Sequence, residues 1–180
     1  AAQQFLTRRT EAAGKAAESN AQSADAPAQL DAVRAELARL AETKDPEIAP
    51  DASLDALEAL LRQNDSDLQA ATQRSEEVKS VNDARAKRRQ EIPVAVTTAR
   101  TRLAAVETQL AAGVDADAQS PLSPERRLAL RAERLALLAD INALEQELAA
   151  LDATKDVATA RRDRAARRLE LATRFHDVLA

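Results

Sequence analysis

The sequence contains no cysteine, methionine, tryptophan or tyrosine, and its only glycines are Gly14 and Gly113. Without cysteine, the chain can form neither a disulfide nor a thiolate metal site. Its only large aromatic side chains are Phe5 and Phe175, so an ordinary compact core is not expected. No stretch approaches the roughly 20 apolar residues that span a bilayer, and no signal segment is present. The net charge of -4 does not favour binding to nucleic acid.

The residues that are abundant favour helices. Hydrophobic residues make up 45% of the chain, largely as alanine, and charged residues make up 31%. Such a composition with little glycine is typical of long helices and coiled coils. The sequence therefore predicts an all-α fold with thin, elongated helical packing.

The first convincing helix is PAQLDAVRAELARLAETK at 27–44, where Leu30, Val33, Leu37 and Leu40 form one apolar face. Upstream, Gly14 weakens helix formation and SNAQSADAP at 19–27 is predicted to be a loop. We therefore predict a poorly ordered or loosely docked segment at 1–27 and an elongated helical domain at 28–180.

Two long helical arms of similar length are predicted at 54–111 and 124–179, each about 85 Å long. Asp51 or Ser53 can cap the first arm, Pro93 predicts a kink or break in it, and Gly113 suits the residue after its end. The second arm begins with Ser123 as N-cap, Pro124 and Glu125, and nothing is expected to interrupt it. The short loop between equal arms predicts a long antiparallel helical hairpin.

Charges offer a check on this hairpin. With the turn near residue 117, opposite charges face each other along most of both arms. The expected neighbours are Glu107 with Arg126, Arg127 and Arg131; Arg100 and Arg102 with Glu133; Arg85, Lys87, Arg88 and Arg89 with Glu145, Glu147 and Asp152; Glu76 and Glu77 with Arg161 and Arg162; Asp65 and Asp67 with Arg167 and Arg168.

One end of the hairpin is expected to carry a third helix. The 30–43 helix should fold back beside 54–68 and 165–179, which makes a three-helix bundle with Phe175 filling its interior. The end next to the interhelical loop should stay two-stranded.

No motif for catalysis, cofactor binding or metal binding is found, and no small-molecule ligand is predicted. His176, the only histidine, is interpreted as an ordinary residue near a helix C-terminus, where a partly positive imidazole suits the helix dipole. The basic runs at 86–90 and 160–168 are interpreted as solvated faces that pair with the opposite arm, because arginines at about 100° per residue spread around a helix.

Several stretches resemble one known family. They are LDALEALLRQNDSDLQAATQRSEEV, RRQEIPVAVTTARTRLAAVETQL around Pro93, and the long segment that begins LSPERR and ends ARRDRAARRLE. Over about 28–179 the chain resembles the N-terminal periplasmic helical, or porin, domain of large, MscK-like channels of the MscS family of mechanosensitive channels.

The resemblance implies a soluble periplasmic segment of a channel in the bacterial inner membrane, which opens under membrane tension during osmotic stress. It also implies protein partners, either other subunits of the same channel or envelope proteins. The alternative is a stand-alone helical-hairpin scaffold or adaptor for protein–protein interaction. An RNA-binding helical arm is disfavoured by the acidic balance, and the missing motifs argue against an enzyme.

Overall fold

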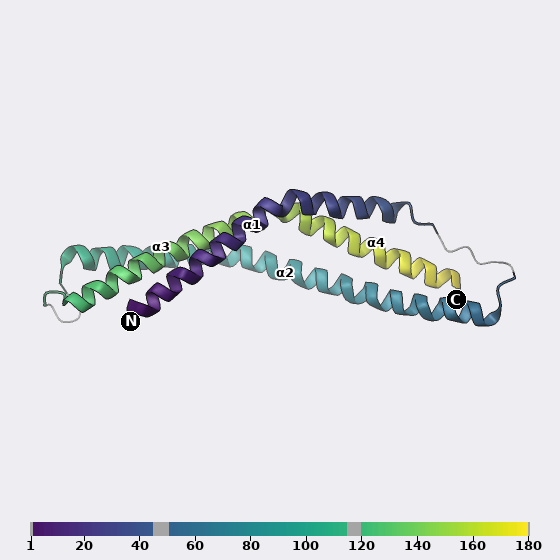
Figure 1. Ribbon diagram of the computed structural model, residues 1–180, viewed down its shortest axis with the longest axis horizontal. Coiled ribbons are helices and arrows are strands. Elements are labelled where there is room, and N and C mark those ends of the chain that lie inside the picture. The colour runs from purple at the N-terminus through teal and green to yellow at the C-terminus, as the bar shows by residue number, and fades with distance from the viewer. Residues whose placement is uncertain (1, 45–50, 115–119, 180) are drawn as a thin grey trace. The chain divides into compact units, whose positions relative to one another are not determined.

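The computed structural model describes residues 2–44, 51–114 and 120–179. It contains four helices: α1 (Ala2–Ala41), α2 (Leu54–Ala112), α3 (Pro124–Ala153) and α4 (Lys155–Leu179) (Figure 1). Within the described residues there is no strand beyond an isolated bridge between Val114 and Pro121. The predicted all-α class is confirmed.

Helix ends lie where the sequence signals place them. The Ser53 hydroxyl accepts a hydrogen bond from the Ala56 amide at 3.3 Å, and that of Ser123 accepts one from the Arg126 amide at 3.1 Å. Gly113 follows α2 with a φ of 68°, and its amide donates to the Gln109 carbonyl at 3.2 Å. A positive φ strains residues with a Cβ, so glycine suits this end.

The chain divides into two compact units that share α1 and α2. Unit 1 comprises Ala1–Asp25 and Ala86–Thr154, and unit 2 comprises Ala26–Arg85 and Lys155–Ala180. Each unit therefore contains one part of α1, one part of α2 and one complete helix, which is α3 in unit 1 and α4 in unit 2.

In unit 1, α2 and α3 pack as the predicted antiparallel hairpin. Its apolar core consists of the buried residues Val106, Leu122, Leu130 and Leu137, with Ala99, Leu103 and Leu110 packed against them. The loop closes through a hydrogen bond from the Leu122 amide to the Gly113 carbonyl at 2.9 Å. On α2, Ala99, Leu103, Val106 and Leu110 recur at steps of four, three and four residues, so this regularly spaced face is the one that leaves water.

The loop predicted at 19–27 is wrong, because α1 runs unbroken from Ala2 to Ala41 through Gly14 and Pro27. Gly14 and Pro27 each disfavour helix, by about 1 and 3 kcal/mol, but burial of one α1 face outweighs this local preference. The expectation that only two helices lie next to the interhelical loop stays a prediction, although α1 packs on α3 farther along, at Ala143. The division into a segment 1–27 and a domain 28–180 stays a prediction.

Two further expectations concern interruptions. Pro93 does not break α2, which continues through it. The second arm, predicted to be uninterrupted, is divided at Thr154, which separates α3 from α4. The amide and the hydroxyl of Thr154 both donate to the Ala150 carbonyl, at 3.0 and 2.6 Å. At this one residue the helical hydrogen-bond pattern is interrupted.

Candidate functional site

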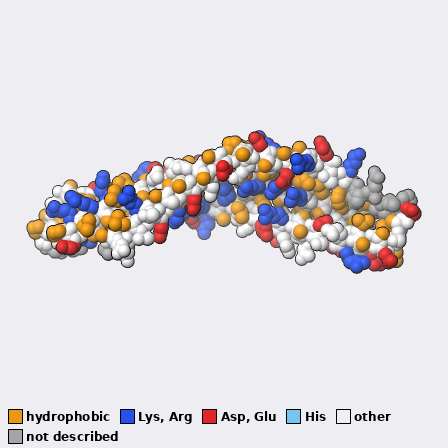
Figure 2. All heavy atoms as spheres, viewed as in Figure 1, with side chains coloured by type: hydrophobic (Ala, Val, Ile, Leu, Met, Phe, Trp, Pro, Cys, Tyr) orange, Lys and Arg blue, Asp and Glu red, His pale blue; other side chains and the backbone are white. Residues whose placement is uncertain are grey.

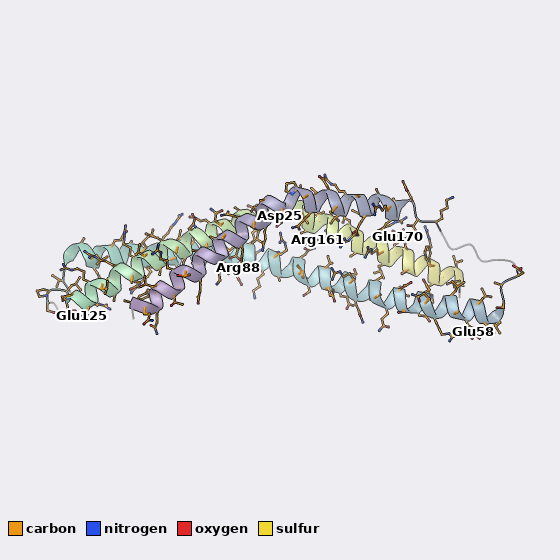
Figure 3. The ribbon with its side chains drawn as sticks, in the orientation of Figure 1. Asp25, Glu58, Arg88, Glu125, Arg161 and Glu170 are labelled. Carbon is orange, nitrogen blue, oxygen red and sulfur yellow. The ribbon has the colours of Figure 1, made fainter. Side chains whose placement is uncertain are left out.

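The strongest polar contacts of unit 1 join α2 to α3. Arg88 on α2 (Figure 3) donates from Nε and Nη2 to the two carboxylate oxygens of Glu147 at 2.6 and 2.7 Å, a bidentate geometry that fixes both side chains. Glu147 also raises the pKa of Arg88 through this hydrogen bond. The further pairs across this interface are Arg89–Asp152, Arg100–Glu145, Arg102–Glu133 and Arg134–Glu107.

These pairs test the predicted register. Arg102–Glu133, Arg88–Glu147 and Arg89–Asp152 are among the expected neighbours and are confirmed. Glu107 instead pairs with Arg134, and Arg100 pairs with Glu145, both farther along α3 than predicted. Arg134 lies three residues beyond the predicted Arg131, whereas Glu145 lies twelve residues beyond the predicted Glu133, so charge matching predicts the orientation better than the exact partners.

Glu133 is the one charged residue among the buried residues of the described chain. Arg102 Nε donates to Glu133 Oε1 at 2.7 Å, and this hydrogen bond raises the pKa of Arg102. A buried carboxylate is costly unless it is paired, so α2 must present Arg102 opposite Glu133. The pair therefore selects one alignment of the two helices.

A second interface in unit 1 holds α1 against α3 with small side chains. Ala12 and Ala16 on α1 form a buried cluster with Ala143 on α3, and Ala139 packs beside them. Because alanine is short, two helices that meet through it can approach closely. Little apolar area is buried per residue, so this contact is weaker than the leucine-rich one between α2 and α3.

Asp140 on α3 is the polar partner of α1 at this interface. Arg8 Nε lies 2.7 Å from Asp140 Oδ2, although that buried oxygen has no partner in hydrogen-bond geometry among the described residues. Burial raises the pKa of the Asp140 carboxyl, and the positive charges of Arg8 and Lys15 offset only part of this rise. Beside the pair lies a groove of about 730 Å³, lined by charged residues of both signs and by Leu144 and Leu151.

In unit 2, α4 contacts both other helices. Arg164 and Arg168 approach Glu36 of α1 at 2.7 and 3.4 Å, and Arg161 donates to the Gln29 side chain at 2.8 Å. Toward α2, the buried Asn64 amide donates to the Ala172 carbonyl at 3.4 Å. These contacts hold the three segments together, while the predicted three-helix bundle at this end stays a proposal.

The residues singled out in the sequence are distributed over these interfaces. His176 Nε2 lies 3.4 Å from Asp65 Oδ1, which was expected opposite Arg167 or Arg168. Of the basic run at 160–168, Arg161, Arg164 and Arg168 contact α1, although pairing with the first arm was predicted. Figure 2 shows acidic and basic side chains interspersed on the visible face, without one large region of a single sign.

Sequence reasoning missed the face that α1 uses. Ala12, Ala16, Ser19 and Ala26 are buried and recur at steps of four, three and seven residues, in phase with the buried Val33 seven residues later. Alanine and serine give little hydropathy signal, but their heptad spacing in phase with the downstream leucines could have revealed the helix.

The described residues contain neither a cluster of metal ligands nor a membrane-spanning helix. No group of three or more His, Asp or Glu residues that could hold a metal ion is present there. None of the helices in that part of the chain combines the length and hydropathy of a membrane span.

The arrangement is thus a set of helix interfaces organised by heptads and paired charges. No curated protein and no solved structure matches the chain significantly. Residues 1–174, nearly all of the chain, match the mechanosensitive ion channel porin domain, and the chain therefore belongs to that family.

Proposed function

We propose that the chain is a periplasmic, extramembrane helical domain that acts as a structural or regulatory lever or spacer for a tension-gated channel of the bacterial inner membrane. Family membership supports the link to a mechanosensitive channel rather than to an enzyme. The matched residues, 1–174, include the N-terminal part of α1 as well as the hairpin. Location in the periplasm rests on the resemblance to the periplasmic regions of large channels.

The observation that carries a mechanical role is α2. It is one helix of 59 residues that contributes a long segment to each unit. Residues of α3 brace its C-terminal half through the bidentate Arg88–Glu147 pair and the buried core around Val106. Asn64 ties its N-terminal half to α4. Each part of α2 is therefore braced within its own unit, and a braced helix resists bending better than an isolated one, as a lever or a spacer requires.

Partners in this proposal are other subunits of the same channel or other envelope proteins. The mixed charges of the helices suit pairing with protein surfaces, since exposed ion pairs select partners and orientation more than they add affinity. No specific observation favours the alternative, a stand-alone scaffold or adaptor.

Deletion of residues 1–174 from the channel subunit tests for a regulatory role, with patch-clamp measurement of the tension threshold and of inactivation. We expect a shifted threshold at unchanged single-channel conductance. An unchanged threshold together with unchanged inactivation would contradict the proposal.

Two insertions in α2 between Arg85 and Ala86 separate a lever from a spacer. A seven-residue helical insertion keeps the apolar face in phase and adds about 10 Å, whereas a flexible Gly-Ser insertion of equal length interrupts the helix. A lever predicts a larger threshold shift for the flexible insertion, and a spacer predicts a larger shift for the helical one. Equal tension thresholds in the two insertion variants and the parent channel would exclude both roles.

A further inference from the structure

Unit 2 contains an apolar groove between α1, α2 and α4. Its volume is about 370 Å³, within the range of small-molecule sites in proteins. Leu40 of α1, Ala71 of α2, and Leu171 and Phe175 of α4 provide its apolar walls. Phe175, expected to fill the interior of this end, instead forms one wall of the groove and leaves it open.

The groove exists because the side chains that face it are small. Ala70 and Ala71 on α2 and Ala165 and Ala172 on α4 all line it. Well-packed interiors leave few voids larger than a water molecule, and a water molecule takes about 30 Å³ of liquid. An open apolar groove of this size holds several water molecules against surfaces that cannot hydrogen-bond to them, so an aliphatic ligand that displaced them would gain free energy.

The polar residues of the groove indicate the charge of the ligand. Arg74 and Arg168 line it, against the single carboxylate of Asp67. Arg74 also pairs with Glu77 at 2.9 Å, and Arg168 approaches Glu36 at 3.4 Å. A guanidinium has five N–H donors, so each arginine retains donors for a further acceptor. Both side chains are more than half exposed, which places their charged ends toward solvent.

We propose that this apolar groove binds a fatty-acid-like monocarboxylate, with the aliphatic chain along Leu40, Ala71 and Phe175 and the carboxylate near Arg74 and Arg168. Apolar burial supplies most of the affinity, and the two arginines select an anionic head over a neutral one. The proposal commits to one free aliphatic chain and not to the paired acyl chains of a phospholipid held in a bilayer.

Calorimetric titration of the 180-residue chain with octanoate, decanoate and dodecanoate, each below its micelle concentration, tests the proposal. Burial of methylenes predicts about 10–15-fold tighter binding for each pair of carbons added. Absence of dodecanoate binding would overturn the proposal. So would binding to phosphatidylglycerol vesicles without binding of free dodecanoate.

Groove-filling variants locate the site. Ala71→Leu should weaken dodecanoate binding at least tenfold, and Ala70→Leu, at an exposed position of the same groove, gives a second test if the first variant folds poorly. Ala59→Leu, on an exposed part of α2 outside the groove, is the matched control and should bind like the parent. Unchanged binding in both Ala70→Leu and Ala71→Leu would overturn the proposal.

A second pair of ligands tests the role of the charges. The double variant Arg74→Gln with Arg168→Gln should weaken dodecanoate binding about tenfold and leave dodecan-1-ol binding unchanged. Arg62→Gln, which removes another exposed arginine of α2, is the control and should alter neither. Equal losses for the acid and the alcohol would refute the proposed carboxylate contact.

Discussion

Leu130 provides the sharpest test of the hairpin core. Its side chain is 0% exposed and belongs to the cluster with Val106, Leu122 and Leu137. Leu130→Ala removes buried methyl groups and leaves a cavity, because neighbours held on two helices relax only partly. Substitutions of this kind cost about 2–5 kcal/mol of stability, and for the fully buried Leu130 we expect a loss of about 3 kcal/mol.

Leu128 offers a control on the same helix. It lies two residues from Leu130 but is 61% exposed. Leu128→Ala makes the same chemical change at nearly the same distance from the helix start, and it should alter the free energy of unfolding by no more than about 0.5 kcal/mol. The contrast between the two variants therefore isolates burial from helix propensity.

Urea denaturation followed by circular dichroism at 222 nm measures both variants, since the chain has no tryptophan to report unfolding. Leu130→Ala should also lower Tm by about 6–12 °C if the chain unfolds cooperatively. If it lost less than about 1 kcal/mol, or as little as Leu128→Ala, the α2–α3 core would not be the one described above.

Three further predictions concern single sites. Gly113→Ala should destabilise the chain by about 1–2 kcal/mol because of the positive φ. Gly14→Ala, with open space around the added Cβ in mid-helix, should stabilise it by about 0.5–1 kcal/mol. Changes of the same sign in the free energy of unfolding, measured by urea denaturation, would contradict this. Arg88→Gln should cost about 1 kcal/mol, and a double-mutant cycle with Glu147→Gln should assign most of it to their coupling, which an additive result would refute. Because the pKa of Asp140 is raised in the folded state, its carboxylate reduces stability as pH rises through that pKa. Asp140→Asn should therefore be more stable than the parent at neutral pH and lose this advantage below the ordinary aspartate pKa. A stability difference that widened in acid would contradict this.

The antiparallel α2–α3 pairing was predictable because large apolar side chains recur at regular steps. Val106, Leu130 and Leu137 lie on the faces that this spacing selects, and all three are buried. The antiparallel register also predicted that Arg88 lies near Glu147, and these two side chains form an ion pair. In long helices rich in leucine, the spacing of the apolar residues indicates which face packs against a partner helix, so the local sequence was enough to predict this pairing.

The contribution of α1 was not predictable in this way. Gly14 and Pro27 locally disfavour a helix, and Ala12 and Ala16 give no hydropathy signal that would predict their packing against α3. The apolar groove of unit 2 depends similarly on which alanines face one another across two helices. Neither feature follows from the hydropathy of a single segment.

The sequence by itself determined the helical class, the helix starts at Ser53 and Ser123, the end at Gly113 and the antiparallel direction of the hairpin, because caps and heptads act through neighbours within a few residues. Tertiary structure decided that α1 continues to Ala2, that the second arm is divided at Thr154, and which small residues pack and which leave a groove. The physical reason is that alanine contributes little free energy alone. Its effect depends on how closely another helix approaches, which only the assembled unit fixes.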